Sequence, residues 1–430
     1  MTQPQLPISI SRNDSAQLVI EVQENLNKLG KSVLATDENT FNRSIYRIPT
    51  FMREVHPKAF EPQLVSFGPY HHGKPQYASM ELEKQKAFRR LKTNPEMLES
   101  IVQTVTDNLQ NLLGAYDKLI EGEWAKRPAK FLEVLIVDGC FMLSFLKKCP
   151  PSLSSMSWDI KRDMLLLENQ LPMLLLDDLY SILPNMDGRL AWFICKSMCF
   201  ASGEAVSMGG NLHILDMYRM SLLGTTILEN KDGSMERKTK KSGPEYQVIR
   251  HATQLRDAGI DFQESGTKSL TDVSFDSKKG VLKIPQLVVD DDSEASLLNV
   301  MAFEKLHEEA GSEVTSFVVL MNNLIDVDED VALLSSKNIL ANALGDDQSA
   351  AELFGSLGKG AAMDLESHIT EVHHQVNLHC RRPWNEWCAS LKHNYFHNPW
   401  AIISLVAAIL GFAILIVQAV YQIVDYYRGN

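Results

Sequence analysis

The sequence has few cysteines and no surplus of positive charge. Six cysteines in 430 residues are too few for a disulfide scaffold. The 42 Lys and Arg residues against 54 Asp and Glu residues give a formal net charge of −12, whereas nucleic-acid-binding proteins usually carry a basic surplus. Because hydrophobic residues make up 45% of the chain, a mainly disordered protein is excluded as well.

The N-terminus lacks the features of a secretory signal peptide. It contains no basic segment followed by an apolar stretch, so we predict a flexible N-terminal arm over residues 1–40. The rest of the chain shows no internal repeat. We therefore expect one helical domain over residues 41–393, interrupted by a polar loop near residues 229–247.

Common catalytic motifs are also missing. The sequence has no GxSxG elbow, no GxGxxG and no phosphate loop with the Walker spacing. We therefore assign no catalytic, cofactor-binding or metal-binding residue, and we expect no cofactor. The alternative is an unrecognised membrane-bound enzyme, such as a hydrolase that uses Cys140 or the His71-His72 pair. The simpler interpretation is that Cys140 is a small core residue and that both histidines are structural.

Two groups of residues invite a metal hypothesis that their spacing does not support. Asp290, Asp291 and Asp292 lack the spacing and central glycine of an EF-hand, so we expect them to cap the next helix. The histidines near the C-terminus, such as His368 and His373, are one residue out of register with a zinc-protease motif.

Most of the body has the apolar periodicity of helices. Apolar residues recur at three- and four-residue spacing, which predicts amphipathic or buried helices. The expected segments are residues 80–92, 97–122, 131–148, 163–183, 190–201 and 211–224. Pro172 must break or kink the fourth of these. The fold class is therefore mainly α (α+β), with a helical globular body.

Three shorter segments depart from this pattern. Residues 45–75 are punctuated by Pro and Gly, which indicates an extended, loop-rich segment. The β-rich runs Thr271–Phe275 and Val281–Val289 predict a β-hairpin, with Pro285 at a sheet edge or a bulge. The polar residues 168–170 lie in an apolar stretch, so we expect them to bracket helices across the core by hydrogen bonds.

The C-terminal end contains an uncharged run long enough to cross a membrane. Residues 398–424 contain no charged side chain, and Ala401–Tyr421 as a helix spans about 31 Å. Aromatic residues flank both ends, as interfacial belts require. We predict a single transmembrane helix over residues 398–424, followed by a short tail over residues 425–430.

Basic residues predict the orientation of this helix. Arg381, Arg382 and Lys392 precede the helix, whereas only Arg428 follows it. This asymmetry places the body in the cytosol. We expect a single-pass C-terminal anchor, at the plasma membrane rather than at an endomembrane.

Two charged segments are candidates for contacting a partner. The polar loop contains five basic residues between Lys231 and Lys241. Residues 290–330 contain twelve acidic residues and only one lysine, Lys305, a local net charge of −11. The simpler interpretation of such segments is solvated surface, but they can also attract a protein partner of opposite charge.

Several blocks in a fixed order carry a resemblance to a known family. They are IYRIPTFMREVHPKAFEPQLVSFGPYHHGK, MELEKQK, VDGCFMLSFL, DMLLLENQLPMLLLDDLY, ATQLRDAGIDF, GVLKIPQLVVDDDSEASLLNVMAFEKLH and WNEWCASLKHNYFHNPWAIISLVAAI. Together they resemble the plant domain of unknown function 247 family (DUF247, UPF0481-type membrane proteins), from about Ile45 to Tyr427. The departures are His56, where the family usually has Asn, and Phe60, where it usually has Tyr.

The resemblance implies a plant protein with a C-terminal membrane segment and without established enzymatic activity. It transfers no catalytic residue. Some grass members are associated with self-incompatibility. We therefore expect a membrane-anchored protein that acts in recognition or signalling by protein–protein binding, with the lipid bilayer and an unidentified protein as partners and no nucleic acid.

Overall fold

The structure is a computed structural model of a mainly helical protein. It describes residues 43–91, 94–117, 122, 124, 126–186, 188–200, 212–224, 249–365, 367–381 and 399–428. Within these residues there are sixteen α-helices and five short strands, which confirms the predicted fold class. The predicted arm over residues 1–40 and the polar loop near residues 229–247 lie outside the described residues.

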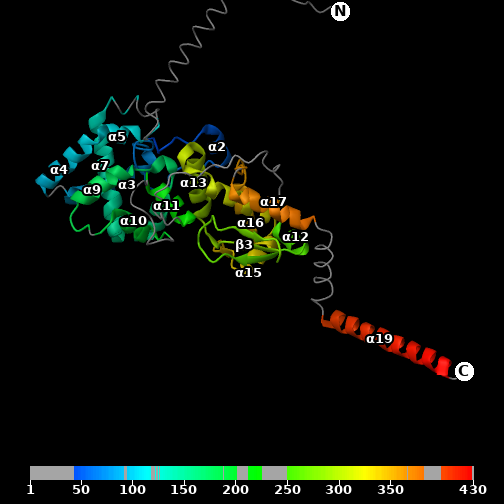
Figure 1. The fold of residues 1–430 in the computed structure, drawn as a ribbon. Helices are drawn as coiled ribbons and strands as arrows, with labels where there is room; N and C mark the ends of the chain where they lie inside the picture. The colour runs from blue at the N-terminus through cyan, green and yellow to red at the C-terminus, as the bar shows by residue number, and fades with distance from the viewer. Residues whose placement is uncertain are drawn as a thin grey trace, which may run out of the picture.

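The N-terminal part of the body is a group of helices around one central helix. Its α-helices are α2 (Thr50–Val55), α3 (Ala78–Leu91), α4 (Pro95–Asp107), α5 (Leu109–Gly114), α7 (Pro128–Lys147), α8 (Ser157–Asp163), α9 (Met173–Ile182) and α10 (Leu190–Met198). Three short 3-10 helices join them: η2 (Pro75–Tyr77), η3 (Pro151–Met156) and η4 (Leu167–Asn169). Helices α3, α4, α9 and α10 pack on α7, and their apolar side chains form one buried cluster, the N-terminal core (Figure 1).

The C-terminal part contains the remaining helices of the body. These are α11 (Ile214–Leu223), α12 (Ala252–Asp257), α13 (Ser293–Leu306), α14 (Glu313–Leu324), α15 (Asp328–Ser336), α16 (Asp347–Leu357), α17 (His368–Cys380) and the 3-10 helix η5 (Glu308–Ala310). Helix α14 packs against α13 and α16, and α15 packs against α12 and α16. Their apolar side chains form a second buried cluster, the C-terminal core.

Five strands form two small sheets beside the C-terminal core. The strands are β1 (Asp261–Glu264), β2 (Ser274–Asp276), β3 (Val281–Ile284), β4 (Leu287–Val289) and β5 (Leu340–Asn342). The predicted hairpin is confirmed, because β2 pairs with β3 in antiparallel register. Gly280 closes its turn with a φ of +67°, a conformation that suits glycine.

The second strand of the hairpin differs from the prediction. We expected one run over residues 281–289 with Pro285 at an edge or a bulge, but Pro285 ends β3 and β4 joins β5 in a separate parallel sheet. Strand β3 is not at an edge, because β1 pairs with it in parallel on its other side. Proline has no N–H to donate, so the chain leaves the first sheet at that residue.

One predicted helix ends earlier than expected, and another breaks where the sequence predicts. The segment 97–122 breaks at Asn108, which ends α4 and precedes the short helix α5. The segment 163–183 breaks before Pro172 as predicted, because α9 starts only at Met173. Residues 45–75 contain only the six-residue helix α2 in an otherwise irregular path, as the proline spacing predicts.

The segment between α8 and α9 lies where the two cores meet. Leu167 belongs to the C-terminal core, whereas Leu171 belongs to the N-terminal core. Leu165 packs against both. Any polar side chain in this segment is therefore enclosed and must find its hydrogen-bond partners inside the protein.

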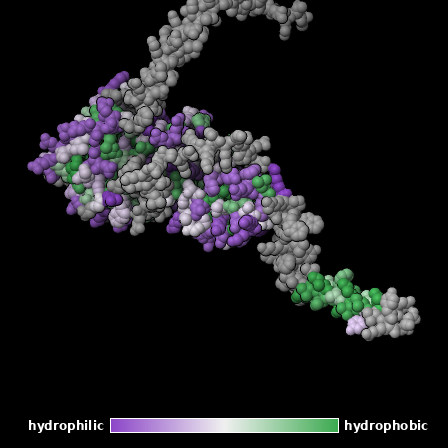
Figure 2. Space-filling view, viewed as in Figure 1, coloured by the Kyte–Doolittle hydropathy of each residue, from purple (hydrophilic) through white to green (hydrophobic). Residues whose placement is uncertain are grey.

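The last helix, α19 (Pro399–Arg428), is the longest in the described residues. Its residues 406–423 contain no charged side chain, and none of this stretch is buried by the rest of the protein. Figure 2 shows its hydrophobic surface, which contrasts with the largely hydrophilic surface of the body. Helix α19 is thus long and apolar enough to cross a membrane.

Candidate functional site

The irregular segment 61–72 needs hydrogen-bond partners for its backbone, and buried side chains supply them. Both carboxylate oxygens of Asp163 accept backbone N–H groups, from Gln63 at 2.9 Å and from Leu64 and Val65 at 2.8 and 2.9 Å. A backbone outside regular structure cannot pair with itself, so it is stable inside a protein only when other groups satisfy it. Asp163 therefore replaces the pairing that a neighbouring strand would give.

Asn169 and Gln170 continue this pattern. Asn169 accepts from the backbone N–H of Phe67 at 2.6 Å and donates to the carbonyl of Val65 at 3.0 Å. Gln170 donates to two carbonyls of its own segment and accepts from the N–H of Leu215 in α11. The prediction that residues 168–170 bracket the core by hydrogen bonds is confirmed.

Asp138 in α7 forms a fully buried ion pair with Lys84 of α3. The Lys84 Nζ lies 2.7 Å from Asp138 Oδ1, and the two side chains are only 0% and 2% exposed to solvent. Asp138 also accepts from the N–H of Gly68, and Lys84 donates to the carbonyl of Ser66. Burial raises the pKa of Asp138 to about 6, although the lysine opposes this shift.

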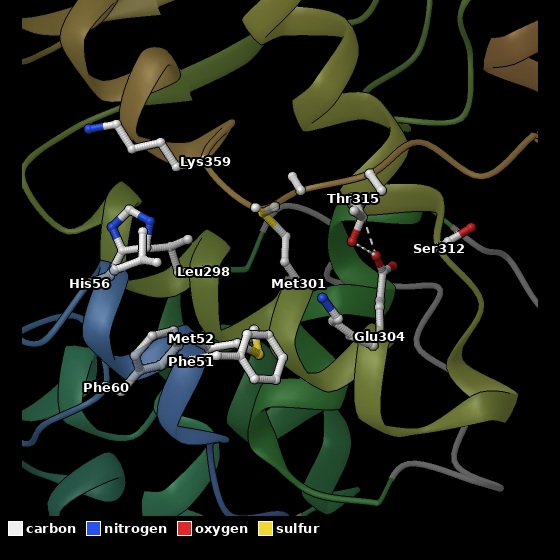
Figure 3. Close-up of a pocket in the computed structure, with 15 residues that line it drawn as sticks. Phe51, Met52, His56, Phe60, Leu298, Met301, Glu304, Ser312, Thr315 and Lys359 are labelled. Atoms are coloured by element: carbon white, nitrogen blue, oxygen red, sulfur yellow. Dashed lines mark hydrogen bonds between the residues drawn. The ribbon is translucent and has the colours of Figure 1, made fainter. Parts of the chain in front are cut away.

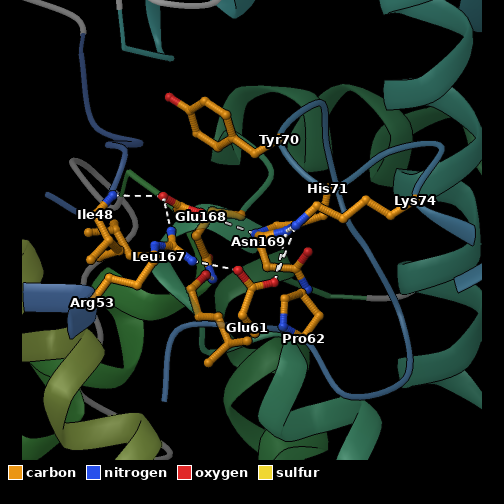
Figure 4. A network of polar contacts seen from close by, with 12 residues as sticks. Ile48, Arg53, Glu61, Pro62, Tyr70, His71, Lys74, Leu167, Glu168 and Asn169 are labelled. Carbon is orange, nitrogen blue, oxygen red and sulfur yellow. Dashed lines mark hydrogen bonds and ion pairs between the residues drawn. The ribbon is translucent and has the colours of Figure 1, made fainter. Parts of the chain in front are cut away.

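A third buried carboxylate, Glu168, faces an open polar cavity of about 610 Å³. One of its oxygens accepts from the Ile48 N–H and lies 2.7 Å from the Arg53 guanidinium. The other lies 3.3 Å from Nε2 of His71 (Figure 4). Burial alone would raise its pKa, but the contacts with His71, Arg53 and Ile48 prevail and lower the pKa of Glu168 to about 2.

Two further charged residues of the cavity wall contact this group, while Arg47 and Asp117 also line the cavity. Glu61 lies 2.5 Å from Arg53 and 3.3 Å from Lys74. Lys74 in turn contacts Nδ1 of His71 at 2.8 Å. Because a lysine ammonium can only donate, Nδ1 accepts and the proton of a neutral His71 is on Nε2, towards Glu168. We name these five residues, Arg53, Glu61, His71, Lys74 and Glu168, the polar cluster.

The polar cluster contains part of a catalytic arrangement. An ionised carboxylate that orients an imidazole is the base end of many nucleophilic sites. Here the other ring nitrogen faces an ammonium instead of a hydroxyl or thiol. Thr50 lines the same cavity, but no hydrogen bond joins it to His71 in the described residues. This arrangement fixes the His71 ring between two charged groups. It is better suited to binding a charged ligand than to activating a nucleophile.

The other residues of the enzyme alternative lie elsewhere. Cys140 is buried in the N-terminal core, and burial raises the pKa of its thiol to about 12, so a reactive thiolate is not available. His72 lies near the Trp124 ring and 4.0 Å from Glu81, outside the polar cluster. Of the two neighbouring histidines, only His71 takes part in it.

The residues of the metal hypothesis are engaged locally. Asp290 accepts from the hydroxyl of Ser293 and from the N–H of Asp292, in the turn that leads into α13. The expected capping is not seen, because Asp292, the residue at the N-cap position, makes no side-chain capping hydrogen bond. His368 contacts the carbonyl of Val273, and His373 is buried in the body. Among the residues that the structure describes, no group of three or more possible metal ligands gathers.

The acidic residues of segment 290–330 do not form one continuous surface. Glu304 is buried and holds Arg219 at 2.8 Å. Asp330 is buried and accepts hydrogen bonds from the backbone N–H groups of Thr253 in α12 and of Asp326 just before α15. Between them, α14 is largely apolar and belongs to the C-terminal core. The exposed acidic side chains are therefore separated. Asp290 and Asp291 precede α13, Glu308, Glu309 and Glu313 lie before or at the start of α14, and Asp326, Asp328 and Glu329 follow α14.

The polar cluster was not visible in the sequence because its members are far apart. Arg53 and Glu168 are separated by more than a hundred positions and follow no periodicity. Two signals do point to this region. One is the proline-rich segment, whose backbone needs partners, and the other is the polar triplet 168–170 in an apolar stretch.

Comparison with known proteins gives consistent results. The family model described as "Plant protein of unknown function", DUF247, matches residues 45–414. The UPF0481 protein At3g47200 of Arabidopsis thaliana is 26% identical, over 90% of this chain and 88% of that protein. The putative UPF0481 protein At3g02645 of Arabidopsis thaliana is 23% identical, over 95% of both chains. No solved structure gives a significant match.

The family match and the two relatives cover both cores of the body. The match begins at the start of the described residues and reaches into α19. The family has no assigned activity, so the match transfers no functional residue. Since it spans well over half of the sequence, this chain belongs to the DUF247 family of plant proteins of unknown function.

Proposed function

We propose that this protein is anchored in a membrane by α19 and acts by binding a protein partner. The observation that carries the proposal is the exposed apolar surface of α19, which the rest of the described chain does not bury. An exposed helix of this length is unfavourable in water but favourable in lipid, where about 20 apolar residues span the hydrocarbon core.

The ionisable groups inside the body favour binding over catalysis. Asp138, Asp163, Glu168 and Glu304 all accept hydrogen bonds from backbone or pair with a buried cation. These contacts stabilise the fold, so the four carboxylates have a structural role. The groups free to meet a partner are the exposed acidic residues on either side of α14, which would steer a basic protein surface towards the body.

The orientation and the membrane belong to the same proposal. The basic residues Arg381, Arg382 and Lys392 precede the span, so the body lies in the cytosol, beneath the plasma membrane. If the source is a grass, the recognition role extends to self-incompatibility. The basic loop Lys231–Lys241 is a second candidate contact, but it lies outside the described residues.

Charge reversal combined with proximity labelling in plant tissue tests the binding role. Glu308→Lys with Glu309→Lys reverses an exposed acidic pair, and Glu352→Lys is the matched control at an exposed acidic position of α16. We expect the double variant to lose labelled partners while its melting temperature and membrane fraction stay unchanged. An unchanged set of partners in the double variant would contradict the proposal for this surface.

One observation favours the enzyme alternative. The polar cluster lines an open cavity in which an ionised carboxylate lies 3.3 Å from an imidazole nitrogen. His71→Gln keeps a hydrogen-bonding side chain of similar length. If that variant kept its melting temperature, abundance and partner capture but lost biological activity, the binding proposal would have to be replaced by a hydrolytic one.

A further inference from the structure

A second cavity lies on the other side of α2, between that helix and the C-terminal core. Its volume is about 310 Å³, within the range of small-molecule pockets. The walls are mainly apolar and come from α2, from the segment that follows it, and from α13: Phe51, Met52, Val55, Phe60, Leu298 and Met301. Figure 3 shows Phe51, Met52, Phe60, Leu298 and Met301 around a common space.

Two lysines lie at the edge of this apolar cavity. Lys305 places its Nζ 5.0 Å from the centre of the Phe51 ring, and Lys359 lies near His56 at one end of the cavity (Figure 3). Within the described part of the chain, neither ammonium is within 4.0 Å of a carboxylate. The nearby Glu304 does not compensate them, because it is buried against Arg219 and Thr315.

His56 provides an unsatisfied polar group in the same wall. Its side chain is only 8% exposed, and Nδ1 lies 3.6 Å from Glu294. In the described residues Nε2 is buried and has no hydrogen-bond partner. A buried polar atom without a partner destabilises a protein by about 1–3 kcal/mol, so its retention near Lys359, in the wall of a cavity that Lys305 also lines, indicates a ligand with a polar, negatively charged end.

We propose that this cavity binds a small amphipathic carboxylic acid, whose apolar body contacts the α2 and α13 side chains and whose carboxylate pairs with Lys359 and His56. An alcohol of the same shape would fill the apolar space but leave the positive charge uncompensated. A free amine would be repelled. The inference does not depend on the proposed partner binding or on the membrane anchor.

The test is calorimetric titration of the full chain in lipid nanodiscs, with nanodiscs lacking the protein as the blank. The probes are 2-naphthylacetate, decanoate and the neutral analogue 2-(2-naphthyl)ethanol. We expect at least one carboxylate to bind with one site per chain. The alcohol should bind at least about tenfold more weakly than 2-naphthylacetate, because it loses a charged hydrogen bond.

Two variants locate the binding to this cavity. Lys359→Gln removes the charge and should weaken carboxylate binding about tenfold or more, whereas Lys283→Gln, at an exposed lysine of β3, should leave it unchanged. Val55→Trp, at an exposed position of α2, should fill the opening and abolish binding. Failure of both carboxylates to bind, equal binding of the alcohol, or unchanged affinity in Lys359→Gln would each overturn the proposal.

Discussion

Helices α7 and α19 are both long and strongly apolar, yet one forms the centre of the body and the other is exposed. Helix α7 places Asp138 and Gly139 in the middle of its apolar sequence. Asp138 has Lys84 as a partner, and Gly139 allows Leu179 of α9 to pack closely. The apolar stretch of α19 has no charged residue, and nothing approaches the space beside Gly411 within 4 Å.

The difference teaches how a core helix and a membrane helix are distinguished. Apolar composition is shared by both, since a helix that is apolar all round is buried either in a protein or in lipid. What identifies the core helix is a polar residue that only a protein partner can satisfy, next to a glycine that admits a neighbouring helix.

A carboxylate placed at a fully buried apolar position of the body should have the largest effect. Leu166→Asp and Leu175→Asp each bury a charge at a position without solvent access, which costs several kcal/mol against a typical total stability of about 5–15 kcal/mol. We expect both variants to be unfolded in thermal melts. Ile409→Asp in α19 is the control, because it is exposed and should leave the melting of the body unchanged.

Wild-type melting of both leucine variants would mean that Leu166 and Leu175 are not part of the core of the body. Because α9, which contains Leu175, packs on α7, the comparison between α7 and α19 would then lose its basis.

Removal of one partner of the buried ion pair comes next. Asp138→Ala leaves the ammonium of Lys84 without its buried carboxylate, which should destabilise the protein by about 3–5 kcal/mol. Asp138→Asn keeps an acceptor for the Gly68 N–H and should be less harmful. Chemical denaturation of the full chain in detergent measures both, and Gln418→Leu in α19 should have no effect on the body. Equal stabilities for all three variants would contradict this account.

Acid should destabilise the body before it affects α19. Burial lowers the pKa values of His213 and His373 to about 4, in spite of Asp216 beside the first. The folded protein therefore keeps both imidazoles neutral, whereas the unfolded chain binds protons below its ordinary histidine pKa of about 6.5. Stability is complete above that pH and falls as the pH decreases, by about 2 kcal/mol per histidine at pH 5.

Melting temperatures measured from pH 7 to pH 5 check this dependence, with His373→Leu expected to weaken it. Residues 406–423 contain no Asp, Glu or His. Membrane association should therefore be the same over the same range. A pH-independent melting temperature would show that the two histidines are not held neutral by burial.

The smallest expected effect comes from matched glycine substitutions. A Cβ at Gly139 would lie 2.4 Å from Cδ1 of Leu179, the mobile end of a side chain, so Gly139→Ala should destabilise the body by about 1–2 kcal/mol. Gly411→Ala meets no atom within 4 Å and should not change the stability of the body. Denaturation midpoints compare the two variants. Equal midpoints would mean that α7 and α9 do not pack closely at this position.

The helices of the body were predictable because their apolar residues repeat with the helical period. This holds for α3, α7 and α10, whose ends lie within a few residues of the predicted ends. Strand β1 was missed, because its four residues have only one buried side chain and its partner β3 is distant in sequence. The parallel pairing of β4 with β5 was missed for the same reason.

The candidate site was predictable only in part. The triplet 168–170 was expected to hold the core together, since polar residues in an apolar segment need partners. The positions of those partners were not predictable, because Asp163 and Asn169 bind backbone atoms whose location depends on the whole fold. For the same reason the sequence could not place Arg53 beside Glu168, or Lys359 beside His56.

The most direct test of the central claim is the fractionation of a chain that ends at residue 393, before α19. The account predicts that this chain leaves the membrane fraction after a carbonate wash, while the full chain remains in it. It also predicts a cooperative melt like that of the full chain, because α19 contributes nothing to either core. A truncated chain that still stays firmly in the membrane fraction would contradict the claim that α19 is the anchor.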